Sequence, residues 1–171
     1  MVKAIIIDDE IHCRKTLGML LKEYCPGVLV TEQCADAESG LEAIQKLKPD
    51  LVFLDIEMPN MNGFEMLEKI PVINFEIVFT TSYDQYAIKA FRFSALDYLL
   101  KPVDERDLKK TLLKYNTLKN HFGNSQSFVR SLFKKHKTRL LVKKGIENIS
   151  IRINDIVIIY TDNKLVYIVD K

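Results

Sequence analysis

Polar residues suited to phosphoryl chemistry follow four short apolar runs of the sequence. Asp8 and Asp9 follow the first run, Asp55 follows another, and Thr81 and Lys101 follow two later ones. Three carboxylates in one crevice repel one another and stay ionised only if a cation compensates them. Oxygen ligands alone suit a hard cation, and Mg²⁺ typically combines one or two carboxylates with waters and a phosphate oxygen. The pattern therefore predicts a Mg²⁺ site that acts on a phosphoryl group.

The metal ligands are predicted from position and from the kind of oxygen that each residue offers. Asp9 and Asp55 are the expected direct ligands, and Asp8 is expected to act through a water molecule. The backbone carbonyl of Glu57, two residues beyond Asp55, is expected to supply a further oxygen. Any one of these acids alone is better explained as a strand-end residue at a solvated rim, so the prediction rests on the set.

The remaining members of the set complete a site for phosphoryl transfer. Asp55 is the predicted nucleophile, which forms an acyl phosphate. The transferred group needs positive charge around its three peripheral oxygens. Mg²⁺ neutralises one oxygen, the Lys101 ammonium pairs with a second, and the Thr81 hydroxyl donates to the third. A cis Lys101–Pro102 peptide bond is one way to direct that ammonium inward.

The elements that position these residues follow from the alternation of buried strands and amphipathic helices over the first 120 residues. Such alternation predicts an α/β fold with a doubly wound, five-stranded parallel sheet. In a sheet of this kind, functional residues lie at the carboxyl ends of the strands. The predicted strands are 4–7, 28–34, 51–54, 76–80 and 96–100, and the predicted helices are 11–24, 37–47, 64–70, 84–93 and 105–120.

The last third of the chain has a different pattern. Residues 122–137 form a predicted linker, and 138–171 form a predicted all-β segment with strands at 140–142, 149–153, 156–160 and 165–169 and a hairpin turn at 161–164. Residues 1–120 hold 15 Lys and Arg against 19 Asp and Glu, a net charge of −4, whereas residues 121–171 hold 10 against 4, a net charge of +6. The basic part is either a nucleic-acid-binding surface or an ordinary solvated one.

Composition indicates a globular protein in a reducing compartment. Hydrophobic residues make up 47% of the 171 residues and charged residues 28%. No apolar run has the length of a membrane span or of a signal peptide, so a cytoplasmic location without membrane contact is expected. Cys13, Cys25 and Cys34 have no paired spacing and are expected to be free thiols. His12 beside Cys13 is not expected to bind a metal, because adjacent helical residues point in different directions.

The residues singled out above resemble the receiver domain of two-component response regulators. The resemblance covers residues 1 to about 121, and it rests on four motifs: Ile7-Asp8-Asp9-Glu10, Asp55 to Gly63, Thr81-Ser82-Tyr83 and Tyr98 to Pro102. It implies a flavodoxin-like receiver fold. Thr81 is preferred to its neighbour Thr80 because the family's hydroxyl residue is followed by a small residue, here Ser82.

The resemblance also implies roles and partners. A sensor histidine kinase would transfer a phosphoryl group from phosphohistidine to Asp55, with Asp8 and Asp9 as metal acids and Lys101 as the phosphate-pairing cation. Thr81 and Tyr98 resemble the switch pair that reports phosphorylation to the surface of the fourth helix, fifth strand and fifth helix, where the family forms homodimers. Such a protein is not an enzyme in the usual sense, because it catalyses only its own phosphorylation and dephosphorylation.

Two segments resemble receivers that are joined to LytTR-type DNA-binding domains. They are residues 79–84 and 95–103 of the receiver, and the strand pattern after residue 138 is similar to the opening strands of a LytTR domain. The resemblance implies a transcription regulator whose full-length parent binds DNA, with the LytTR domain cut short in this chain after about a third of its usual span.

Two other classes of function remain as alternatives. A Mg²⁺-dependent phosphatase with an aspartate nucleophile would resemble haloacid-dehalogenase-like enzymes, but these place the nucleophile after the first strand and a second Asp two residues later. Here Asp55 follows the third strand and Glu57 stands two residues on. An interaction scaffold that is no longer phosphorylated is the other alternative, and the intact set of acids, hydroxyl and lysine argues against it.

Overall fold

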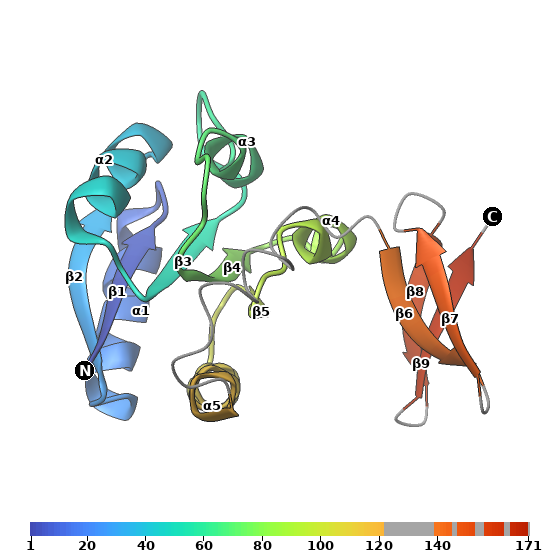
Figure 1. Ribbon diagram of the computed structural model, residues 1–171. Coiled ribbons are helices and arrows are strands. Elements are labelled where there is room, and N and C mark those ends of the chain that lie inside the picture. The colour runs from blue at the N-terminus through green and yellow to red at the C-terminus, as the bar shows by residue number, and fades with distance from the viewer. Residues whose placement is uncertain (122–138, 145–146, 153–155, 163–164, 171) are drawn as a thin grey trace.

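The computed structural model describes residues 1–121, 139–144, 147–152, 156–162 and 165–170. Residues 1–121 form a five-stranded parallel sheet with helices on both sides (Figure 1). Its strands are β1 (Val2–Ile7), β2 (Val28–Cys34), β3 (Leu51–Asp55), β4 (Glu76–Thr81) and β5 (Asp97–Leu100). Its helices are α1 (Ile11–Tyr24), α2 (Ala37–Leu47), α3 (Gly63–Glu68), α4 (Ala87–Arg92) and α5 (Glu105–His121).

The strand order is β2-β1-β3-β4-β5, which is the order of flavodoxin-like sheets and confirms the predicted doubly wound architecture. Its switch point lies between β1 and β3, where the chain turns from one half of the sheet to the other. Ile7 pairs with Leu54 in the register of these two strands, so Asp8 and Asp55 stand at adjacent strand ends. The predicted clustering of acids therefore follows from the topology itself.

The core consists of two layers, one on each face of the sheet. Helices α2, α3 and α4 pack on one face, and α1 and α5 pack on the other. In β1, Ile5 and Ile7 belong to the first layer, while Ala4 and Ile6 belong to the second. All residues of β3 are buried. This burial on both faces explains the unbroken apolar runs of the sequence, since each fully buried aliphatic side chain contributes about 1.5–3 kcal/mol.

Local signals set the ends of the helices around the site. The Asp36 side chain accepts a hydrogen bond from the Ser39 amide at 2.8 Å and caps α2. Asn62 and Glu65 form a reciprocal capping box at the start of α3. Helix α3 ends at Glu68, two residues before the predicted end, because the chain tightens there: the Ile70 amide bonds to the Leu67 carbonyl ahead of a proline.

Helix α4 is shorter than predicted. It begins at Ala87, and Asp84 is not its cap. Instead, the Tyr83 amide donates to the Thr81 hydroxyl at 3.3 Å, and the Ala87 amide donates to the Asp84 carbonyl at 3.2 Å. The polar residues after β4 therefore fold into turns, because side-chain and short-range backbone acceptors compete with helical hydrogen bonding.

The described strands of the last part confirm its all-β character. Strands β6 (Arg139–Lys144) and β7 (Glu147–Arg152) form one antiparallel hairpin, and β8 (Ile156–Asp162) and β9 (Leu165–Asp170) form another. The predicted turn at 161–164 is too long, because Thr161 and Asp162 still pair with Val166 and Leu165. The predicted linker at 122–137 lies outside the described residues, and the domain boundaries stay predictions.

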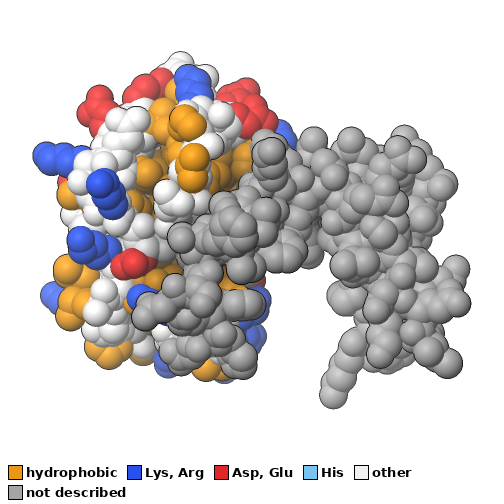
Figure 2. Space-filling view, in the orientation of Figure 1, with side chains coloured by type: hydrophobic (Ala, Val, Ile, Leu, Met, Phe, Trp, Pro, Cys, Tyr) orange, Lys and Arg blue, Asp and Glu red, His pale blue; other side chains and the backbone are white. Residues whose placement is uncertain are grey.

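Surface charge on residues 1–121 is distributed unevenly. Acidic side chains gather along the edge of the molecule over α2 and α3 (Figure 2). This agrees with the net negative charge that the sequence gives to the first part of the chain. In the part of the chain that the structure describes, no helix combines the length and apolar character needed to cross a membrane.

Gly63 provides a test of how closely the site is packed. A Cβ atom at this position would lie 2.4 Å from the Asp55 carbonyl oxygen, which is a backbone atom and has no room to move. We predict that Gly63→Ala lowers the free energy of unfolding by about 2–3 kcal/mol, measured by urea denaturation. Gly27→Ala is the matched control, because nothing lies within 4 Å of its added Cβ. Equal stability of the two variants would contradict the prediction.

Candidate functional site

The predicted acidic residues meet at the carboxyl ends of β1 and β3. Oxygens of Asp8, Asp9 and Asp55 all lie within 4.8 Å of one another. Asp8 and Asp55 are 2% and 4% exposed, whereas Asp9 is exposed. Adjacent oxygens around one Mg²⁺ are ~3 Å apart and opposite ones ~4.2 Å, given metal–oxygen distances of ~2.1 Å. The three carboxylates therefore suit a small hard cation after only slight side-chain adjustment.

Lys101 lies among these acids, as the sequence predicts. Its Nζ atom is 2.6 Å from Asp55 Oδ2, 2.9 Å from Asp8 Oδ2 and 3.1 Å from Glu10 Oε1. The Lys101–Pro102 peptide bond is cis. Burial alone would lower the pKa of Lys101, but hydrogen bonds to Asp55 and Asp8 outweigh it and hold the pKa well above its ordinary value. The side chain is therefore a permanent ammonium at physiological pH.

The two buried aspartates are less well compensated than the lysine. Burial raises the pKa of Asp55 and of Asp8, and the hydrogen bonds from Lys101 lower it only in part. The compensation is incomplete because the single ammonium of Lys101 pairs with three carboxylates, those of Asp8, Glu10 and Asp55. Ionised Asp8 and Asp55 thus destabilise the folded state, and a further cation would relieve that cost.

The turn after β1 is held by Glu10, which belongs to the first receiver motif, and by Arg14, which lies outside the four motifs. The Arg14 guanidinium donates to the backbone carbonyls of both Asp8 and Asp9, the latter at 3.0 Å. Glu10 donates its amide to Asp8 Oδ1 at 2.9 Å, and its carboxylate pairs with Lys101. The spacing from Asp8 to Arg14 places Arg14 one helical turn into α1. This spacing is the sequence feature that could have indicated the contact of Arg14 with the turn. Both residues fix the peptide that carries the acids.

Cys13 also lies close to Asp8 and Glu10. Burial raises the pKa of its thiol, which keeps it protonated and makes it a poor metal ligand. Cys13, Cys25 and Cys34 are all free thiols, as predicted.

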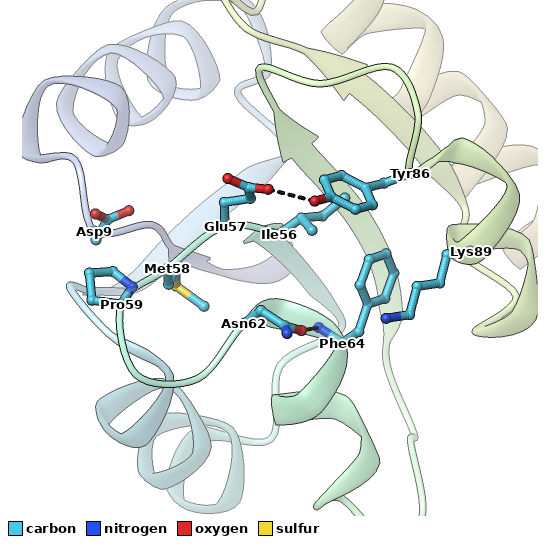
Figure 3. Close-up of a pocket in the computed structure, with 9 residues that line it drawn as sticks. All are labelled: Asp9, Ile56, Glu57, Met58, Pro59, Asn62, Phe64, Tyr86 and Lys89. Atoms are coloured by element: carbon cyan, nitrogen blue, oxygen red, sulfur yellow. Dashed lines mark hydrogen bonds between the residues drawn. The ribbon is translucent and has the colours of Figure 1, made fainter.

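The loop after β3 adds a pocket beside the acids. The Glu57 amide donates to Asp55 Oδ1 at 3.2 Å, and the Glu57 carboxylate accepts a hydrogen bond from the Tyr86 hydroxyl at 2.6 Å. The hollow between this loop and α4 has a volume of about 510 Å³ (Figure 3). Its lining residues are Asp9, Ile56, Glu57, Met58, Pro59, Asn62, Phe64, Tyr86 and Lys89.

The predicted switch residues are linked through the backbone of one residue, Tyr83. The Thr81 hydroxyl, fully buried, accepts from the Tyr83 amide at 3.3 Å, and the Tyr98 hydroxyl donates to the Tyr83 carbonyl. Burial raises the pKa of Tyr98 to about 12, so its hydroxyl remains a donor. Thr80 is the strand partner of Asp55, and its buried hydroxyl has no hydrogen-bond partner among the described residues. The choice of Thr81 over Thr80 therefore stays a prediction.

The sequence matches the response regulator receiver domain over residues 4–113. The chain belongs to the response regulator receiver family. Relatives agree with this assignment. The receiver is similar to the transcriptional regulatory protein BtsR of Escherichia coli (strain K12), with 48% identity over 113 residues, which are 66% of this chain and 47% of that protein. An uncharacterized response regulatory protein of Vibrio cholerae is 49% identical over the same shares of the two chains. The chain spans about half the length of the curated relatives it matches.

Solved structures of receivers have the same architecture. The response regulatory domain of protein mrkE from Klebsiella pneumoniae is 30% identical, with a TM-score of 0.64 over 70% of this chain and 99% of that one. A LuxR-family DNA-binding response regulator from Staphylococcus aureus is 27% identical, with a TM-score of 0.62 over 68% of this chain and 99% of that one. The parallel sheet of the receiver is thus shared across response regulators of different types.

The raised pKa of Asp55 predicts a pH-dependent stability. The native receiver binds a proton at this carboxyl more readily than the unfolded chain does, so stability is lost as the pH rises above the unfolded value of about 4. We expect Asp55→Asn to stabilise the metal-free receiver at pH 7 by about 1 kcal/mol, with the difference vanishing toward pH 3. The measurement is thermal unfolding of the wild type and of Asp55→Asn in a chelating buffer from pH 3 to pH 7.

Asp36→Asn is the control for this pH experiment. The hydrogen bond from the Ser39 amide lowers the pKa of Asp36, so its ionised form stabilises the fold and its contribution is lost on acidification. The two substitutions therefore change stability at neutral pH in opposite directions. An Asp55→Asn variant that is less stable than the wild type at pH 7 would contradict the assignment of an uncompensated charge at this position.

Proposed function

We propose that this receiver is switched by phosphorylation of Asp55, which takes its phosphoryl group from a phosphohistidine of a sensor histidine kinase. The observation that supports this most directly is the 2.6 Å contact between Lys101 Nζ and Asp55 Oδ2 beside two further aspartates. A buried nucleophilic carboxylate, a fixed ammonium and a cluster of acids for a metal are the components that phosphoryl transfer requires.

The chemistry of the step follows from these groups. An oxygen of Asp55 attacks phosphorus, the phosphorus–nitrogen bond to histidine breaks, and the imidazole leaves with the electron pair. The Lys101 ammonium, already bonded to Asp55, pairs with a peripheral oxygen as negative charge moves onto the phosphoryl group. We assign Mg²⁺ to Asp9 and Asp55 directly, to Asp8 through water and to the Glu57 carbonyl. Bound Mg²⁺ supplies charge neutralisation at another peripheral oxygen.

The response to phosphorylation is assigned to Thr81 and Tyr98. A Thr81 hydroxyl that turns to the phosphoryl group releases the backbone N–H of Tyr83, and the carbonyl of the same residue accepts the hydrogen bond from Tyr98. The change then reaches the face made by α4, β5 and α5, which we propose as the homodimer interface. Leu100 is 51% exposed on that face, and Asp97 pairs with Lys114 at 2.7 Å. This face thus offers an apolar contact beside charged groups.

The last part of the chain is proposed as the start of a LytTR-type DNA-binding domain. Its two antiparallel hairpins and its net charge of +6 are consistent with this, and BtsR is named a transcriptional regulatory protein. In the full-length parent, phosphorylation would then control DNA binding and transcription in the cytoplasm. The receiver itself acts on no external substrate under this proposal.

Phosphorylation at Asp55 is the central prediction. After incubation with a small-molecule phosphodonor, intact-mass spectrometry should show a gain of one phosphoryl group that requires Mg²⁺. Asp55→Ala should show no gain, and Asp36→Ala, which alters an aspartate outside the site, should behave as the wild type. A folded wild type that gains no mass would instead favour an interaction scaffold. A gain that survives in Asp55→Ala would mean that another residue is the acceptor.

Arg14 offers a second test, on the metal rather than on the acceptor. Because its guanidinium fixes the carbonyls of Asp8 and Asp9, we predict that Arg14→Ala raises the Mg²⁺ concentration needed for half-maximal phosphorylation by about tenfold. The rate at saturating Mg²⁺ should change less. Lys15→Ala removes an exposed cation next to it and should leave the Mg²⁺ dependence unchanged. Equal effects of the two substitutions would show that only the general charge of α1 matters.

A further inference from the structure

The hydrogen bond between Tyr86 and Glu57 connects two segments that are far apart in sequence. Glu57 lies in the loop after β3, and Tyr86 directly precedes α4. Figure 3 shows the Glu57 carboxylate reaching across the pocket to the Tyr86 hydroxyl, at 2.6 Å. None of the motifs that identified the receiver includes Tyr86, so this contact has no place in the reaction described so far.

The Tyr86 ring is held from two sides. It packs edge-on against Phe64, with ring centres 6.0 Å apart, and against Tyr83, with ring centres 6.1 Å apart. Phe64 is only 1% exposed and belongs to the core. Such aromatic contacts restrict the ring, and the direction of its hydroxyl is therefore set by packing.

Lys89 lines the same pocket but does not bind the Glu57 carboxylate as Tyr86 does. Its ammonium lies 4.4 Å from the centre of the Phe64 ring. Among the described residues, it makes no ion pair with Glu57. In this pocket, the Glu57 carboxylate accepts its hydrogen bond from the Tyr86 hydroxyl.

Glu57 is exposed and makes one hydrogen bond through its backbone and one through its carboxylate. Its amide donates to Asp55 Oδ1 and supports the nucleophile, while its carboxylate is directed toward α4. The site already holds Asp8, Asp9 and Asp55 against the single ammonium of Lys101. Glu10 adds a fourth carboxylate. If the Glu57 carboxylate were free to turn toward Asp55, it would be a fifth, and it would repel an incoming phosphodonor, which is itself an anion.

We propose that Tyr86 is a positioning residue for phosphoryl transfer: its hydroxyl holds the Glu57 carboxylate away from the path of the anionic phosphodonor. This inference rests on the proposed function of Asp55. With acetyl phosphate as donor, an Asp55 oxygen forms a bond to phosphorus, the bond from phosphorus to acetate breaks, and acetate leaves with the electron pair. Tyr86 exchanges no proton in this step and acts only through Glu57.

The test compares rates of phosphorylation by intact-mass spectrometry at saturating Mg²⁺. Tyr86→Phe removes the hydroxyl and keeps the ring, and we expect it to slow the reaction with acetyl phosphate roughly two- to fivefold at low ionic strength. Added salt should reduce the difference in rate between Tyr86→Phe and the wild type, because it screens the repulsion between Glu57 and the donor. Phosphoramidate carries less negative charge than acetyl phosphate, so this difference in rate should be smaller with phosphoramidate.

Substitutions at Glu57 separate positioning from a structural role. Glu57→Gln removes the charge, so Tyr86→Phe should have no further effect in a Glu57→Gln background. Tyr24→Phe is the matched control, because it also removes one phenolic hydroxyl and Tyr24, at the end of α1, is not among the residues that line this pocket. It should react at the wild-type rate. Thermal unfolding of each variant establishes that all are folded at the assay temperature.

The possible outcomes distinguish this inference from the proposed function. A Tyr86→Phe variant that reacts as fast as the wild type would overturn the positioning role while leaving Asp55 as the acceptor. A deficit that persists in the Glu57→Gln background, or that Tyr24→Phe shares, would also overturn it and assign Tyr86 a purely structural role. A folded wild type without Mg²⁺-dependent mass gain would overturn the proposed function, and the inference with it.

Discussion

One ammonium group, that of Lys101, holds together the carboxyl ends of three strands. It follows β5 and reaches past the end of β4 to Asp55 on β3 and to Asp8 after β1. The parallel sheet makes this possible, because all its strands deliver their last residues to one edge. It also creates the problem that the ammonium solves only in part, since acids gathered there repel each other. The site is therefore built around a deficit of positive charge, which a bound metal cation would relieve.

Backbone groups rather than flexible side chains fix the geometry around that charge. Arg14 bonds to two consecutive carbonyls after β1, the Glu57 amide bonds to Asp55, and Gly63 lies too close to the Asp55 carbonyl to carry a side chain. Each contact restrains the backbone that carries one of the clustered acids. Such preorganisation avoids rearrangement during the reaction, and its cost is met in folding by the buried layers on both sides of the sheet.

The difference between what the sequence predicts and what it misses has a physical origin. Strand ends and their polar residues are predictable, because periodicity fixes the strands and topology then brings Asp8, Asp55 and Lys101 to one edge. Arg14 and Tyr86 escape prediction, since their roles depend on how far a long side chain reaches and on which neighbour restrains it. The start of α4 is missed for a related reason: the Thr81 hydroxyl captures the Tyr83 amide, and no helix periodicity records that competition.

Two chains of contacts lead from Asp55 toward the segment between β4 and α4. One runs through Glu57 to Tyr86, and the other, under the proposed function, runs from Thr81 through the backbone of Tyr83 to Tyr98 on β5. Tyr86 and Tyr83 both lie in a segment of turns that is followed by a helix of only six residues. A short helix has little stability of its own, so tertiary contacts decide its position. Under the proposed function, a change of charge at Asp55 would act on both sets of contacts together.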